Sequence, residues 1–181
     1  MKVFNFFLGF VFLLMSVTTM QAQFDPNYKG YYRLKSMGGG DAVSLESNNG
    51  ATGTAKNGAA FMDKTKNVTG QFWKIEDAGN GYYRLKSKGG GDAVSLESNN
   101  GATGTAKNGA AFMDKTQNVS GQLWKIEDAG NGYYRLKSKG GGDAVSLESN
   151  NGATGTAKNG AAFMDKTKNV SGQLWKFEKV K

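Results

Sequence analysis

Apolar and polar side chains alternate along four short stretches of the segment that begins near residue 81. Tyr83 and Leu85 share one face of the first stretch, and Val94 and Leu96 share one face of the second. Alternation with a period of two residues is typical of a strand with one buried face. The pattern predicts four strands, at Tyr82–Ser87, Asp92–Ser98, Ala110–Thr116 and Gly121–Asp128. No window of this segment predicts a helix.

Breaks rich in glycine and asparagine separate the predicted strands. They lie at Gly89–Gly91, Asn99–Gly109, Gln117–Ser120 and Ala129–Gly132. The last break contains an Asn-Gly pair, which favours a tight hairpin because both residues tolerate a positive φ. We expect the apolar faces to form one core, made of Tyr83, Leu85, Val94, Leu96, Phe112 or Met113, Trp124 and Ile126 with their equivalents.

The same unit occurs three times at a period of 51 residues, as Gly30–Asn80, Gly81–Asn131 and Gly132–Lys181. The first two copies differ at four aligned positions, which are Met37/Lys88, Lys66/Gln117, Thr69/Ser120 and Phe72/Leu123. Three copies are too few for a β-propeller. A solenoid needs polar end caps, and the terminal copies here are almost identical to the middle one. The repeat predicts a closed threefold structure, either a β-trefoil or a β-prism of three sheets.

The first 22 residues have the pattern of a secretory signal peptide. Lys2 is followed by an apolar run from Phe6 to Met15 and then by a polar stretch that ends at Ala22. A membrane anchor is the alternative, but the run has about half of the ~20 residues that a spanning helix needs. We expect cleavage near Ala22 and secretion, to the extracellular space or the periplasm. Residues 23–181 are then one domain without membrane insertion, and we expect a monomer.

Composition excludes several kinds of chemistry. The chain has no His and no Cys, so it has no Ser-His-Asp triad, cysteine nucleophile, imidazole or thiolate zinc site, or disulfide. We expect no cofactor and no metal. The 23 Lys and Arg against 15 Asp and Glu give a formal net charge of +8, spread evenly over the copies. This spread favours a solvated surface over a nucleic-acid site, although it would also attract anionic glycans.

Each copy carries a Gln-x-Trp motif near its end, in its last predicted strand, as Gln71-Phe72-Trp73, Gln122-Leu123-Trp124 and Gln173-Leu174-Trp175. With these three motifs, residues 28–181 resemble the ricin-type (ricin B-like) β-trefoil lectin family. The resemblance implies an all-β fold, a β-trefoil with pseudo-threefold symmetry and three four-stranded lobes of about 51 residues. In that family the motif Trp belongs to the core, and the alternation here places Trp124 on the same side as Ile126.

The same resemblance implies a secreted, non-enzymatic carbohydrate-binding protein with one shallow site in each lobe. The chain departs from the family pattern at two positions in each lobe. The usual sugar-binding Asp of the second strand is Ser44, Ser95 and Ser146, and the Asn that often precedes the motif Gln is Gly70, Gly121 and Gly172. Neighbouring polar and aromatic residues are the candidate substitutes.

Five positions in each lobe are candidate carbohydrate-binding residues. The first lobe has Glu46, Phe61, Asp63, Asn67 and Gln71, the second has Glu97, Phe112, Asp114, Asn118 and Gln122, and the third has Glu148, Phe163, Asp165, Asn169 and Gln173. A sugar site needs oxygen atoms that accept hydroxyl hydrogens, an aromatic face and amide donors. Each position also has a structural interpretation: a solvated Glu, an Asp paired with its neighbouring lysine, a turn Asn, a core-edge Gln and a core Phe.

Two weaker motifs also recur. Asn67-Val68-Thr69 and its copies match the glycosylation acceptor pattern and equally suit a turn. Gly38–Asp41 and its copies form a plain turn or an anion-binding nest, with too few carboxylates for tight calcium binding.

Three functions remain open. We expect glycans or polysaccharides as partners, anionic ones included, and no nucleic acid. The alternative is a secreted protein-binding or structural β-trefoil, such as an inhibitor or adhesion module. A glycosidase would need two carboxyl groups roughly 5–10 Å apart, which shallow triplicated surfaces disfavour.

Overall fold

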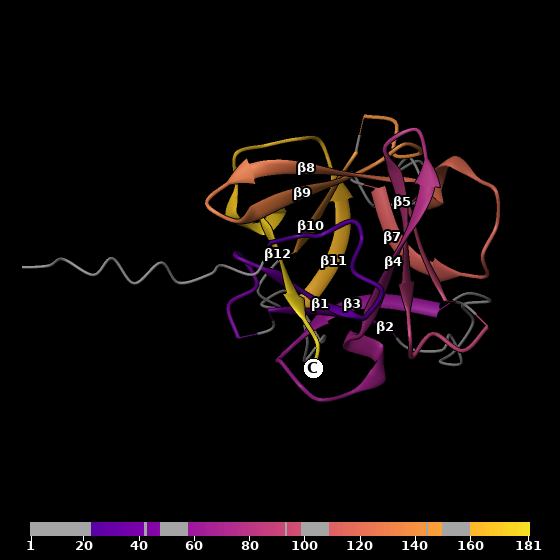
Figure 1. Cartoon of the computed structure of the whole chain (residues 1–181). Helices are drawn as coiled ribbons and strands as arrows, with labels where there is room; N and C mark the ends of the chain where they lie inside the picture. Colours follow the sequence, from indigo (N-terminus) through magenta and orange to yellow (C-terminus); the bar gives the residue numbers. More distant parts are fainter. Residues whose placement is uncertain are drawn as a thin grey trace, which may run out of the picture.

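Twelve strands form in the part of the chain that the structure describes, four in each 51-residue repeat (Figure 1). The computed structural model describes residues 23–41, 43–47, 58–92, 94–98, 109–143, 145–149 and 160–181. The strands are β1 (Tyr32–Ser36), β2 (Ser44–Ser47), β3 (Gly58–Asp63), β4 (Trp73–Gly79), β5 (Tyr82–Ser87), β6 (Ser95–Ser98), β7 (Gly109–Asp114), β8 (Trp124–Gly130), β9 (Tyr133–Ser138), β10 (Ser146–Ser149), β11 (Gly160–Asp165) and β12 (Trp175–Lys179). The predicted signal peptide and most of the Asn99–Gly109 break lie outside the described residues.

Six strands close into a barrel. Antiparallel pairing runs from β1 to β4, β5, β8, β9 and β12 and back to β1. The other six form three hairpins, β2–β3, β6–β7 and β10–β11, and their second strands pair with one another near the centre of Figure 1. A barrel capped by three hairpins is a β-trefoil, so the predicted all-β, pseudo-threefold fold is confirmed. The β-prism is excluded because the strands form one connected sheet.

The core is built around the three tryptophans, which have no exposed surface. The Trp124 indole N–H donates to the Leu96 carbonyl at 2.9 Å, so each Trp ties the barrel to the hairpin of its own lobe. The sequence left open whether Phe112 or Met113 belongs to the core. Met113 does, because the β6–β7 register pairs it with the buried Leu96. The repeated order of apolar residues thus becomes one continuous core.

Two parts of the predicted core are different in the structure. Val94 precedes β6 and is half-buried outside the core cluster, so its prediction as a core residue is wrong. The strand begins at Ser95, and the alternation therefore does not extend to Val94. Ile126 is half-buried at the edge of the core, whereas the equivalent Phe177 is fully buried.

The predicted turns form, and the structure adds a short 3₁₀ helix to one of them in each lobe. Asn131 and Gly132 both have positive φ, 54° and 73°, as the tight Asn-Gly hairpin requires. The break before each motif Trp contains one turn of 3₁₀ helix that the sequence did not predict, η1 (Thr69–Gln71), η2 (Ser120–Gln122) and η3 (Ser171–Gln173). The Gly38–Asp41 segment contains turns, as its plainer interpretation expected.

Neighbouring lobes meet through repeated serine and glycine contacts. Between the second and third lobes, the hydroxyls of Ser98 and Ser138 are hydrogen-bonded, and Ser138 also donates to the Gly121 carbonyl at 3.4 Å. Gly140 packs directly on Gly121, where an added Cβ would overlap the backbone. The other two joints repeat this arrangement, so small residues set how closely the lobes approach.

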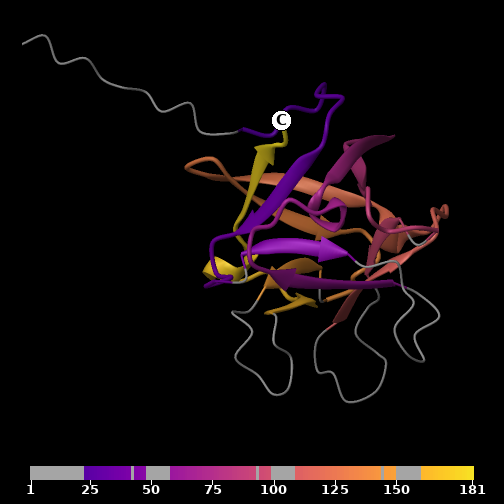
Figure 2. The same cartoon turned by 90° about the horizontal axis from the view of Figure 1, so that it is seen from below.

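The segment that precedes β1, residues 23–31, fills the open end of the barrel, and we call it the lead-in. Figure 2 shows this indigo segment beside the end of β12. The Phe24 ring packs against the aromatic residues at the barrel mouth, Tyr32, Tyr83, Tyr134 and Phe177, with ring centroids 5.0–6.1 Å away. The lead-in therefore closes the core and breaks the threefold symmetry at this end.

Replacing Gly121 by Ala should destabilise the protein by about 1–3 kcal/mol, because the methyl group would overlap the Ser98 carbonyl where neither backbone can easily move. Chemical denaturation followed by Trp fluorescence measures the loss. Gly130→Ala is the matched control. Its φ of 83° opposes a side chain but no atom lies within 4 Å, so we expect a loss of about 1 kcal/mol. Equal losses at the two sites would contradict the steric role of Gly121.

Candidate functional site

Three of the five candidate residues of each lobe lie on the outer face of its β2–β3-type hairpin, and the other two lie in the segment that follows it. The register places Glu46 opposite Phe61 and Ser44 opposite Asp63. Because side chains alternate between the faces of a strand, these four share one face, and the intervening Leu45 and Met62 are fully buried on the other. We call Glu46, Phe61, Asp63, Asn67 and Gln71, with their equivalents, the hairpin-face cluster.

A buried glutamine amide organises this cluster. The Gln71 Nε2 donates to Glu46 Oε2 and to the Lys64 carbonyl, both at 2.8 Å, and its Oε1 accepts the Lys66 N–H at 2.9 Å. Its side chain has no exposed surface. The hydrogen bonds of this amide therefore fix the Glu46 carboxylate and the backbone of residues 64–66. Gln122 and Gln173 repeat this network.

The motif glutamines therefore hold the hairpin-face glutamates against the loop that follows each hairpin. Gln71, Gln122 and Gln173 were predicted as ligand contacts, and their burial instead makes them positioning residues. The glutamates that they hold, Glu46, Glu97 and Glu148, are half-buried beside a half-buried phenylalanine. Each lobe thus presents an oriented carboxylate and part of an aromatic ring to one place on the surface.

Burial raises the pKa of Glu97 above its ordinary value, and the nearby charge of Asp114 acts in the same direction. The hydrogen bond from Gln122 opposes both effects and favours the charged form. Desolvation is the largest cause, which fits a half-buried carboxylate that is partly shielded from water.

The aspartates of the cluster are tied to their own loops. Asp63 Oδ1 accepts the Lys64 N–H at 2.7 Å, and Oδ2 pairs with the Lys66 ammonium. This pairing raises the pKa of Lys66. In the second lobe Gln117 replaces that lysine, and its amide donates to Asp114 Oδ2 at 3.0 Å. The Asp63 and Asp165 charges are thus neutralised by a lysine, whereas Asp114 has a neutral partner.

The remaining predicted residues are accessible to different extents. The loop that follows each hairpin has an exposed asparagine, at Asn67, Asn118 and Asn169. Its exposure suits either a ligand contact or the acceptor of a glycosylation motif. Asp63 and Asp165 are 7% exposed, and Asp114 is half-buried. The structure therefore brings the five positions of a lobe together. In the first and third lobes Phe, Glu and Asn are more exposed than Asp and Gln, whereas Asp114 of the second lobe is half-buried like Phe112 and Glu97.

The two departures from the family pattern have structural causes. Ser44 is buried, and its hydroxyl is hydrogen-bonded to that of Thr65 at 3.0 Å. Gly70 lies against the Ser47 carbonyl and the Glu46 side chain, where no Cβ fits. Thr65 and Lys66 were not predicted as members of this site. The Lys66/Gln117 exchange between otherwise similar repeats was the signal that could have identified Lys66.

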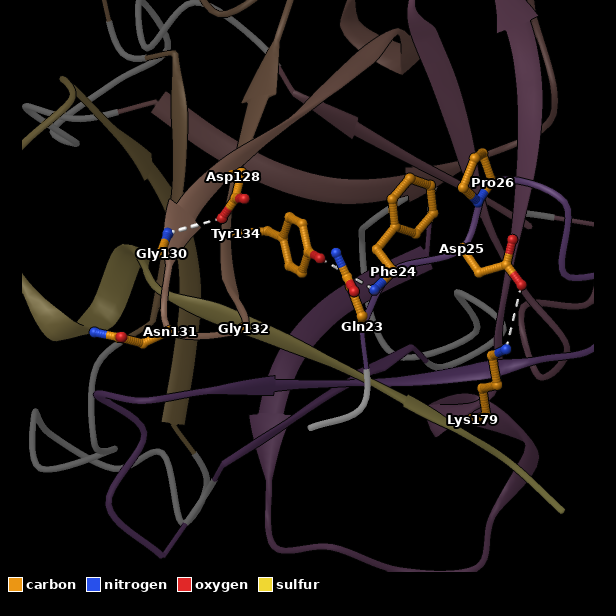
Figure 3. Close-up of a pocket in the computed structure, with 10 residues that line it drawn as sticks. All are labelled: Gln23, Phe24, Asp25, Pro26, Asp128, Gly130, Asn131, Gly132, Tyr134 and Lys179. Carbon is orange, nitrogen blue, oxygen red and sulfur yellow. Dashed lines mark hydrogen bonds and ion pairs between the residues drawn. The ribbon is translucent and has the colours of Figure 1, made fainter. Parts of the chain in front are cut away.

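A separate pocket of about 840 Å³ lies at the barrel mouth (Figure 3). Phe24 and Tyr134 form part of its wall, and the Phe24 N–H donates to the Tyr134 hydroxyl at 3.3 Å. Asp25 and Lys179 form an ion pair of 3.3 Å at its rim. This pocket depends on a lead-in that occurs once, so it cannot supply a site in every lobe. The hairpin face is shallower but recurs with the same chemistry.

The described residues contain no group of three or more His, Cys, Asp or Glu side chains that could hold a metal ion. No helix among them is long and apolar enough to cross a membrane.

Comparison with known families and structures identifies relatives of this fold. Residues 20–108 match the family model described as ricin-type beta-trefoil lectin domain-like, so the resemblance to that family is confirmed. Residues 109–181 repeat most of this matched sequence at the 51-residue period. No curated protein sequence matches the chain.

Solved β-trefoil structures are similar at low identity. The designed threefold-symmetric protein ThreeFoil is 21% identical, with a TM-score of 0.64 over 83% of this chain and 99% of ThreeFoil. SeviL, solved bound to asialo-GM1 saccharide, is 18% identical, with a TM-score of 0.60 over 85% of this chain and 100% of SeviL. The exo-β-1,3-galactanase of Clostridium thermocellum is 20% identical, with a TM-score of 0.66 over 85% of this chain and 31% of the enzyme. These similarities show the fold.

Glu97→Gln should make the protein less sensitive to pH. Because the pKa of Glu97 is raised in the folded state, its stabilising contribution is present at low pH and is lost as pH rises through the folded pKa. Relative to the parent, the variant should therefore gain stability as pH rises above 4.5, the ordinary value for Glu, as measured by urea denaturation. Glu127→Gln, a carboxylate on the barrel wall, controls for the change in net charge. A parent–variant difference that does not vary with pH would contradict the assignment.

Proposed function

We propose that this protein is a secreted, non-enzymatic carbohydrate-binding protein with one shallow site on the hairpin face of each lobe. The observation that carries the proposal is the threefold recurrence of an oriented glutamate beside a phenylalanine. The glutamate accepts hydrogen bonds from sugar hydroxyls, the ring packs on the apolar face of a pyranose, and the exposed asparagine adds donors. The ricin-type family match and the lectin-like neighbours support a carbohydrate-binding role in general.

Multivalency follows from the repeat. A shallow site with a Kd near 1 mM supplies only about −4 kcal/mol. Three linked sites that face one glycan-coated surface can raise the apparent affinity by roughly 10²–10⁴. The lobes differ at few positions, so all three sites accept similar sugars. Export after cleavage near Ala22 would place the protein where such surfaces occur.

The arrangement favours binding over glycoside hydrolysis. Within the described residues, each hairpin face has its glutamate oriented by a glutamine and its aspartate paired with its own loop. A glycosidase needs one carboxyl group free to donate a proton and a second free to attack or to activate water. We therefore propose that the site binds sugars without turnover.

Binding to a glycan array, with and without the glutamates, tests this function. The triple variant Glu46→Gln, Glu97→Gln and Glu148→Gln keeps a hydrogen-bond partner for each motif glutamine. It removes the charged carboxylates that would accept hydrogen bonds from sugar hydroxyls. We expect at least about tenfold weaker binding per site, since a hydrogen bond to a charged group contributes about 1.5–3 kcal/mol. Single and double variants should show stepwise loss on a dense glycan surface and a smaller loss on a sparse one.

The matched control replaces Glu76, Glu127 and Glu178 by Gln. These glutamates have the same charge and are partly exposed on the barrel wall, away from the hairpin face. Retained binding to a neutral terminal sugar in this control, with loss in the first variant, would support the site. Equal loss in both would reject the hairpin face. Absence of binding to every glycan would instead favour the protein-binding or structural alternative.

A further inference from the structure

A basic groove on the barrel wall lies between the second and third lobes. It has a volume of about 170 Å³ and is lined by Tyr82, Lys125, Glu127, Lys137, Lys139 and Val145. We call these residues the wall groove. We propose that the wall groove is a second binding site, which takes an anionic sugar unit of an acidic polysaccharide.

The groove brings like charges together in a way that costs stability. Lys125 lies directly opposite Lys137 in the β8–β9 register. Like charges at directly opposed positions of an antiparallel pair are destabilising. Glu127 pairs with Lys137 at 2.9 Å, which leaves the groove with an excess of positive charge. A carboxylate or sulfate group placed between the ammonium groups would remove this repulsion.

The third lysine is held in place by an aromatic ring and by the joint between lobes. The Lys139 Nζ lies 5.3 Å from the centre of the Tyr82 ring. Its backbone N–H donates to the Leu123 carbonyl of the preceding lobe at 2.8 Å. The hydrogen bond fixes the backbone of Lys139 and the ring contact reduces the freedom of its side chain, so an anion in the groove meets a partly preorganised ammonium group.

The arrangement recurs around the barrel, with one lysine missing from one copy. Between the first and second lobes, Lys74 opposes Lys86, and Lys88 lies over Tyr31. Between the third and first lobes, which we call the third joint, Lys35 opposes Lys176. At the third joint, however, Met37 occupies the position of Lys88 and Lys139, and its side chain is 56% exposed. The protein therefore has two wall sites with three lysines and one that lacks the third.

The shape and chemistry suit a single charged sugar unit. Tyr82 and Val145 supply a small apolar wall beside the ammonium groups, as a pyranose bearing a carboxylate or sulfate requires. Sites repeated around the barrel can engage several units of one polyanion.

Affinity for heparin, used as a sulfated polysaccharide probe, tests the groove. Lys139→Gln and Lys88→Gln should each weaken binding about threefold to fivefold at low salt, and Met37→Lys should strengthen it by a similar factor. Lys115→Gln is the matched control. It removes the same charge from an exposed lysine of the loop beside the hairpin face, and we expect less than a twofold effect.

Two outcomes would overturn the proposal. The first is equal weakening by Lys115→Gln and Lys139→Gln, or no gain from Met37→Lys, since either result would mean that net charge alone drives binding. The second is duplex DNA of matched charge that binds as tightly as heparin with the same response to the variants. NMR chemical-shift changes of backbone amides during titration with a heparin tetrasaccharide locate the binding site independently. Changes centred on Lys139 and Val145 support the groove, and changes centred on Gln117 and Gln122 reject it.

Discussion

A buried glutamine amide holds each lobe in its shape. Gln71 and its equivalents have no exposed surface, so every polar atom of the amide must be satisfied within the protein. The three hydrogen bonds that satisfy it connect the hairpin glutamate to the loop that covers the hairpin face. Two residues later, the Trp indole connects the barrel to the same hairpin. The Gln-x-Trp motif therefore joins the barrel, hairpin and loop of one lobe through satisfied buried polar groups.

Close approach of backbones joins one lobe to the next. Gly121 fits between the Ser98 carbonyl and Gly140, and the paired serine hydroxyls occupy the space beside it. This joint also fixes the position of Lys139, because the residue follows directly after β9 and donates its N–H across the boundary. The geometry of the wall groove thus depends on the same small residues that allow the three lobes to close.

The near-identity of the repeats conceals chemical differences at the surface. Two of the four exchanges between the first and second copies change the charge of a proposed site. Lys66/Gln117 changes the partner of the hairpin-face aspartate, and Met37/Lys88 changes the wall groove. At the barrel mouth, Phe177 and the Phe24 lead-in close the core in a way that the other lobes do not repeat. A threefold backbone can therefore carry sites of unequal charge.

Local and repeated signals in the sequence predict the fold and the residues of the candidate site. Alternation located the strands, the 51-residue period required threefold closure, and the Gln-x-Trp motifs selected the β-trefoil, because these signals are local or directly repeated. Which of these side chains are exposed depends instead on contacts between distant parts of the chain. The strand register turned Met113 inward and Phe112 outward, and placed Glu97 against Gln122. The contact with the Ser98 carbonyl requires glycine at Gly121, and contacts across the lobe boundary require glycine at Gly140 and form the wall groove. Those outcomes depend on distances between residues far apart in the chain, which a local pattern does not contain.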